Sequence, residues 1–105
     1  MTPKHYMNQQ AEEVIATMSK NKHYKAHTEG ILRARLIRKD LEKHPTEYYP
    51  EKVRGLNKAY IETAREIIRQ GNKFIDSTDD FDLGLEVSMA VENYRALLSS
   101  LNKDN

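Results

Sequence analysis

The chain has no cysteine and no tryptophan, and its 105 residues include only two phenylalanines, three prolines and four glycines. Without cysteine, disulfide bonds and thiolate chemistry are excluded, which is compatible with a reducing compartment. With so few large aromatic residues, we expect a core made mainly of leucine, isoleucine, valine, methionine and tyrosine.

Long apolar runs are also missing from the sequence. A membrane-spanning helix needs a run of about 18 apolar residues, and a signal peptide needs a basic region followed by an apolar one. Neither pattern is present, so we expect a cytoplasmic protein with no membrane partner. The formal net charge is only +1, so the composition as a whole does not indicate a nucleic-acid partner.

Strand signals are lacking too, because no stretch alternates between apolar and polar residues and the usual hairpin dipeptides are missing. Apolar residues instead recur at helical spacing in separate stretches that short connections join. This pattern predicts an all-α fold, an antiparallel up-and-down helical bundle of about four helices, with residues 1–105 as a single domain.

The clearest helical stretch is the last one, over about 80–102, and we expect the rest of the chain to be organised around it. Its apolar positions recur at steps of four and three, which predicts a buried seam. The residues of this seam are Leu83, Val87, Ala90, Tyr94, Leu97 and Leu101. The opposite face carries polar residues such as Glu86, Ser88 and Glu92, so we expect water on that side.

Two further helices are predicted at the start of the chain. Thr2 and Pro3 form a helix-start signal, and the first helix runs to about residue 19 with Val14, Ile15 and Met18 on its apolar face. The second helix lies within about 22–44, and residues 24–27 are either its first turn or the end of a linker. Thr28 is its candidate N-cap, and Pro45 ends it because proline cannot continue the hydrogen-bond ladder.

A third helix is predicted from Pro50 to Gln70, since proline suits the first helical position. Gly71 and Asn72 supply a signal for its C-terminal end. Phe74 and Ile75 are then expected to close the end of the bundle.

Charge is unevenly distributed along the chain. Residues 20–43 contain eight basic and three acidic residues, whereas residues 71–105 contain three basic and seven acidic ones. The basic helix either balances the acidic last helix or forms a docking surface for an acidic protein or for nucleic-acid phosphates. Arg33 and Arg35 are two positions apart and cannot both face one narrow neighbouring surface, so we expect docking by at least one basic residue. The candidates are Lys25, Arg33, Arg35, Arg38 and Lys39.

Tyr48 and Tyr49 are adjacent in the predicted connection before Pro50. Neighbouring aromatic residues in a loop either plug the end of a bundle or anchor a partner. We expect one tyrosine to do each, and both complete the predicted partner-binding set.

His23 and His27 lie at i and i+4, a spacing that can hold a metal ion on one face of a helix. The sequence has no cysteine, and no glutamate stands between the two histidines in the metalloprotease pattern. We therefore interpret them as surface histidines and expect neither a metal nor another cofactor.

Arg38 and His44 are six positions apart at the end of the second helix. The pair resembles the Arg-x(4–6)-His motif of the HEPN family of small helical ribonucleases, and the resemblance covers this motif alone. It implies a pair that acts on the scissile phosphate of RNA. Because the sequence shows no catalytic centre, we expect a protein that is not an enzyme.

The leading hypothesis is a small binding module of bacterial or phage type, such as an inhibitor, immunity or regulatory protein, that docks on a partner protein. The first alternative is a nucleic-acid-binding regulator that uses the basic helix, and the next is a HEPN-like ribonuclease. Leu32, Leu36, Ile61 and Ile68 widen the apolar stripes of the second and third helices. These broad stripes predict weak self-association into a homo-oligomer.

Overall fold

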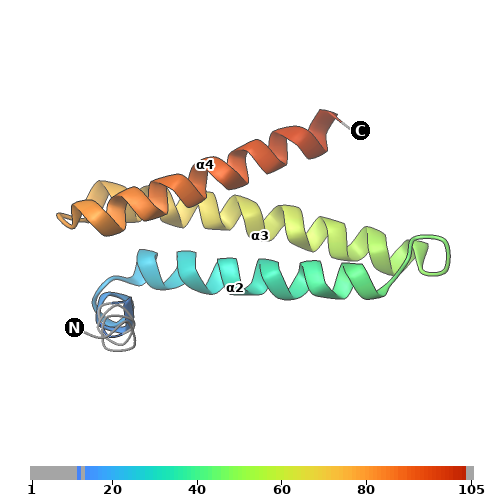
Figure 1. The fold of residues 1–105 in the computed structure, drawn as a ribbon, viewed down its shortest axis with the longest axis horizontal. Helices are drawn as coiled ribbons and strands as arrows, with labels where there is room; N and C mark the ends of the chain where they lie inside the picture. Colours follow the sequence, from blue (N-terminus) through green and yellow to red (C-terminus); the bar gives the residue numbers. More distant parts are fainter. Residues whose placement is uncertain (1–11, 13, 104–105) are drawn as a thin grey trace, which may run out of the picture.

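A computed structural model describes residues 12 and 14–103 of the chain. These residues form α-helices joined by connections, and none of them forms a strand. Three long helices, α2 (Lys22–Lys43), α3 (Pro50–Ser77) and α4 (Phe81–Lys103), follow one another, each antiparallel to the one before it (Figure 1). A helical segment over 14–20 precedes α2. The predicted all-α helical bundle is confirmed, whereas the predicted helix start at Thr2 and Pro3 lies outside the described residues.

The helix α2 begins earlier than its candidate cap suggested. Asn21 is the N-cap, and its side-chain oxygen accepts hydrogen bonds from the backbone N–H groups of His23 and Tyr24 at 3.0 and 3.1 Å. These contacts satisfy two of the donors that a helix start leaves without a partner. The prediction of Thr28 as the cap is wrong, because Thr28 lies inside the helix.

The helix α3 continues past its predicted end at Gln70 and stops at Ser77. Gly71 is buried inside the helix, so its interpretation as an end signal is wrong. A Cβ atom at this position would lie 2.5 Å from Val91 Cγ2 and 2.9 Å from His27 Nδ1. Glycine is required here because both neighbouring helices approach the backbone closely.

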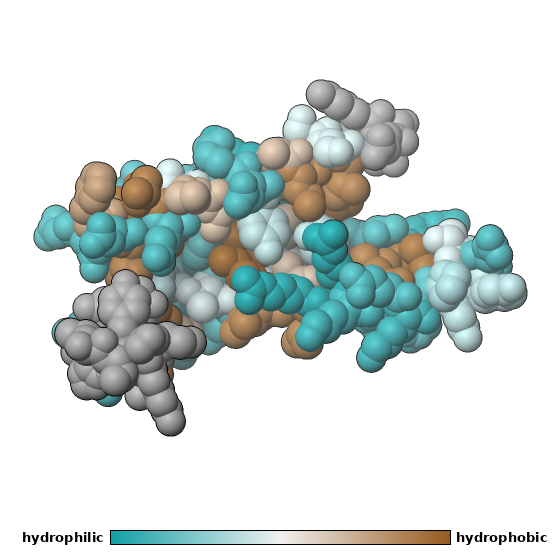
Figure 2. Space-filling model, viewed as in Figure 1, coloured by the Kyte–Doolittle hydropathy of each residue, from teal (hydrophilic) through white to brown (hydrophobic). Residues whose placement is uncertain are grey.

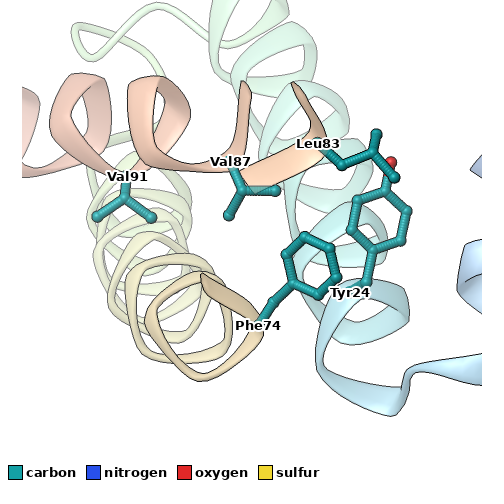
Figure 3. Packing of buried hydrophobic residues seen from close by; sticks show 5 residues of the cluster. All are labelled: Tyr24, Phe74, Leu83, Val87 and Val91. Carbon is teal, nitrogen blue, oxygen red and sulfur yellow. The ribbon is translucent and has the colours of Figure 1, made fainter. Parts of the chain in front are cut away.

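The hydrophobic core lies where the three long helices converge. One buried cluster joins Tyr24 of α2, Phe74 of α3, and Leu83, Val87 and Val91 of α4 (Figure 3). The ring centroids of Tyr24 and Phe74 are 4.8 Å apart at an interplanar angle of 49°, a tilted arrangement that aromatic pairs favour. Phe74 is therefore a core residue.

The helical segment 14–20 packs against this core from outside. Val14 and Met18 contact the buried cluster. Ile15, which was predicted to share their apolar face, is exposed instead.

The central helix of the bundle is α3 and not α4. Both α2 and α4 pack along α3, whereas no Cα atom of α2 lies within 8 Å of one in α4. Figure 1 shows α4 diverging from α3 toward its C-terminal end. The predicted seam of α4 is consequently buried at Leu83 and Val87 but only half-buried at Leu97 and Leu101.

The outer face of α4 is exposed to water at Glu86 and Glu92, as predicted, but it also carries apolar residues that the sequence analysis did not place there. Phe81, Leu85 and Met89 are 79%, 50% and 61% exposed, and their spacing of four places them on one side of the helix. This helix is therefore apolar on two opposite faces, of which α3 covers only one.

Candidate protein-docking groove

The divergence of α4 leaves an open depression over the N-terminal half of α3. It contains a cavity of about 700 Å³ and a second cavity of about 330 Å³, which share Arg38, Tyr60 and Leu97 as lining residues. We call the two cavities together the groove. The apolar residues that line its larger part are Leu41, Pro50, Val53, Tyr60, Ile61, Leu97 and Leu101.

The groove follows α2 from Ile31 to Leu41. Ten residues of α-helix span about 15 Å, so the groove is about three helical turns long. Its floor is formed by α3, and its two sides by α2 and the C-terminal half of α4. This shape can receive a short helix or a ridge of helix side chains.

The rim of the groove is basic. Arg35, Arg38, Arg54 and Lys58 line it, and no aspartate or glutamate among the described residues does. The ion pairs found among the described residues join other side chains, namely Arg69 with Glu66 and Arg95 with Glu92, and Asp40 contacts His44. The positive charge of the rim is thus not neutralised by these pairs, and it favours an anionic ligand.

Two tyrosines lie at the middle of the groove. Burial raises the pKa of Tyr94 above its ordinary value and nearby Tyr60 adds to this effect, whereas Arg35 and Arg38 oppose it. Tyr94 therefore stays protonated at neutral pH, and its hydroxyl can donate a hydrogen bond. Tyr94, Arg35 and Arg38 thus line the same cavity.

Of the basic residues predicted to bind a partner, only Arg35 and Arg38 line the groove. Arg33 and Lys39 are exposed elsewhere on α2, and Lys25 lines a separate depression at the start of this helix. The five residues consequently do not form one surface. No ion pair among the described residues joins α2 to α4, so the contacts give no support to a basic helix that balances the acidic one.

Tyr48 and Tyr49 lie after the C-terminal end of α2, in its connection to α3. Tyr48 is 75% exposed and Tyr49 is 49% exposed. The ring of Tyr49 meets that of His44 edge-on, with centroids 5.1 Å apart. Tyr49 thus packs on the end of the helix pair, and partner binding by either tyrosine stays a prediction.

The interpretation of His23 and His27 as surface residues is wrong for His27, which is only 2% exposed. Its Nδ1 donates a hydrogen bond to the Ile67 carbonyl at 2.8 Å, while His23 Nδ1 lies 2.8 Å from Gln70 Oε1. Burial lowers the pKa of His27 because the protein interior disfavours the charged ring. Both histidines therefore tie α2 to α3.

The pair that resembles the ribonuclease motif is divided between two environments. Arg38 lines the groove, whereas His44 Nδ1 lies 2.8 Å from the Asp40 carbonyl oxygen and 3.1 Å from its carboxylate oxygen Oδ1. His44 thus forms a local contact at the end of α2.

The groove residues of α3, Arg54, Lys58 and Tyr60, were not among the residues predicted to bind a partner. They were missed because the spacing of apolar positions does not specify where neighbouring helices leave the apolar stripe of this helix uncovered. The available signal was its length, since the apolar spacing continues through Ile67, Gly71 and Phe74. Because α4 diverges from α3, it does not cover the full length of so long a helix.

Comparisons with models of protein families, with curated proteins and with solved structures found no match to this chain. Within the described part of the chain, no helix has the length and apolar character needed to cross a membrane. Any functional conclusion therefore rests on the groove and its chemistry.

Proposed function

We propose that the protein is a small helical binding module that docks on a partner protein by receiving a helix of that partner in the groove. The observation that carries this proposal is an apolar floor about three helical turns long that no other described element covers. Amphipathic helices bind such grooves through apolar side chains at i, i+3, i+4 and i+7.

The lining of the groove favours a protein ligand over nucleic acid. Its floor is largely aliphatic, with Leu41, Val53 and Ile61, and its two tyrosines are half-buried instead of forming the exposed aromatic platforms on which bases stack. The basic residues of α2 also lie on different sides of that helix. A nucleic-acid-binding regulator and a HEPN-like ribonuclease stay the alternatives. We propose no enzymatic activity, and the cytoplasmic location stays a prediction from the sequence.

A designed helical peptide tests the proposal. The peptide carries leucines along one face and glutamates along the other, and binding is measured by isothermal titration calorimetry. We expect a Kd in about the micromolar range, and we expect Leu97→Ser to weaken binding at least about tenfold because it removes an apolar contact from the groove.

The matched control is Leu36→Ser, which changes an exposed leucine of α2 outside the groove and should leave peptide binding unchanged. The proposal fails if no helical peptide binds, or if Leu97→Ser binds as the wild type does. Tight binding of a homopolymeric RNA that Arg38→Glu abolishes would favour the nucleic-acid alternative instead.

A further inference from the structure

We infer that the groove receives a second copy of this chain, by docking the outer face of the neighbouring molecule's α4. We call this face, formed by Phe81, Leu85 and Met89, the α4 outer stripe. The inference rests on the proposed function, since it uses the same groove and names its occupant.

The first argument is that α4 carries more apolar surface than its own fold covers. A helix that is apolar on opposite faces is normally buried on both, yet the α4 outer stripe is exposed. Figure 2 shows hydrophobic surface on the upper side of α4 near its N-terminal end, and again where its C-terminal half faces α3. In these two parts of α4, Phe81, Leu85 and Met89 are exposed, and Leu97 and Leu101 line the groove. One chain thus presents a ridge and a recess that both lack a cover.

The second argument is charge. Between Phe81 and Met89 the only charged residues are Asp82 and Glu86, and both are exposed. The groove has the opposite character, because within the described part of the chain four basic residues and no carboxylate line it. Pairing two outer stripes would bring carboxylates together, and pairing two grooves would bring cations together. Only the stripe of one copy against the groove of another is complementary in charge.

The third argument is length. From Phe81 to Met89 the α4 outer stripe spans about 12 Å, and the groove spans about 15 Å along α2. The stripe therefore fits within the groove, and its three side chains are spaced as anchors of a helix ridge. Because the contact joins two different surfaces, it is heterologous, and association continues beyond two copies unless the arrangement closes.

The test uses the full chain and two charge-reversed variants in sedimentation velocity at micromolar concentrations. The groove variant is Arg38→Glu with Arg54→Glu, and the stripe variant is Asp82→Lys with Glu86→Lys. We expect the wild type to self-associate and each variant alone to associate at least about tenfold more weakly. Mixing the two variants should restore association, because the unchanged stripe of the groove variant then meets the unchanged groove of the stripe variant.

Two further variants separate this contact from a general effect of charge or folding. Leu85→Ser removes an exposed apolar anchor and should also weaken self-association, whereas Arg33→Glu, outside the groove, should not. Circular dichroism checks that each variant keeps its helix content. A wild-type chain that stays monomeric at all concentrations, or variants that fail to recover association when mixed, would overturn the inference. In that case, binding of the acidic peptide in the groove would still support the proposed function. If neither self-association nor peptide binding were observed, both the inference and the proposed function would be rejected.

Discussion

At the scale of single residues, close contacts between helices depend on two glycines, Gly30 of α2 and Gly71 of α3. A Cβ atom at Gly30 would lie 2.8 Å from Ile67 Cγ1, and one at Gly71 would lie 2.5 Å from Val91 Cγ2. A Cβ atom at Gly55, in the same helix as Gly71, would meet no neighbouring side chain or helix within 4 Å. The sequence could not distinguish these glycines, because helix contacts and helix ends both favour the residue.

We therefore predict opposite effects of one substitution at two positions of α3. Gly71→Ala should lower the free energy of unfolding by about 1–3 kcal/mol, because its methyl group overlaps the rigid side chain of Val91. Gly55→Ala should raise it by about 0.5–1 kcal/mol, because alanine favours the helix. Urea unfolding monitored by circular dichroism measures both, and equal effects at the two positions would disagree with the packing at Gly71.

A second residue-scale prediction concerns the buried ring of His27, whose pKa is lowered in the folded protein chiefly by burial. In the unfolded chain the pKa of histidine is about 6.5. At pH values between the pKa of His27 in the folded protein and its pKa in the unfolded chain, the unfolded chain binds more protons than the folded protein. The stability that this group contributes is therefore fully present above about pH 6.5 and falls as the pH drops below it. Thermal unfolding at several pH values between about 7.5 and about 5 should show this loss. His27→Gln cannot titrate and should flatten that part of the profile, and an unchanged slope in this variant would assign the effect to another group.

At the scale of helices, the type and number of elements could be predicted from apolar spacing, but their packing could not. Pro45 and Pro50 mark the connection between α2 and α3 correctly, because proline acts on the local backbone. The end of α3 was placed too early, since burial of Gly71 and Phe74 outweighs the local end signal. The divergence of α4 depends on contacts between residues far apart in sequence, which a spacing of apolar positions does not specify.

Because α4 diverges from α3, replacing an apolar side chain by alanine should cost more stability in the core than beside the groove. Phe74 is 1% exposed in the core, and Phe74→Ala should lower the free energy of unfolding by about 3–5 kcal/mol. Leu97 is half-buried beside the groove, so Leu97→Ala should lower it by only about 1–2 kcal/mol. Chemical unfolding of the two variants measures the difference. A loss at Leu97 as large as that at Phe74 would mean that α4 packs tightly on α3 along its whole length.

At the scale of the whole molecule, one end of the bundle is closed and the other is open. Tyr24, Phe74 and Val87 fill the closed end, while the basic rim and apolar floor of the groove occupy the open end. The sequence indicated that α2 is basic and selected Arg35 and Arg38 among its candidates. It could not indicate that Arg54, Lys58, Leu97 and Leu101 would line the same groove, because this arrangement depends on the angle between helices.

The measurement that tests the groove most directly is a methyl NMR titration of the full chain with the leucine- and glutamate-bearing helical peptide. Leu41, Ile61, Leu97 and Leu101 report on the groove, and Val87 and Val91 report on the core. We predict that the groove methyl signals shift with peptide concentration while the core signals stay in place, and that a peptide with lysine in place of glutamate produces much smaller shifts. Shifts confined to residues outside the groove, or no shifts with either peptide, would contradict the assignment of the groove as the docking site.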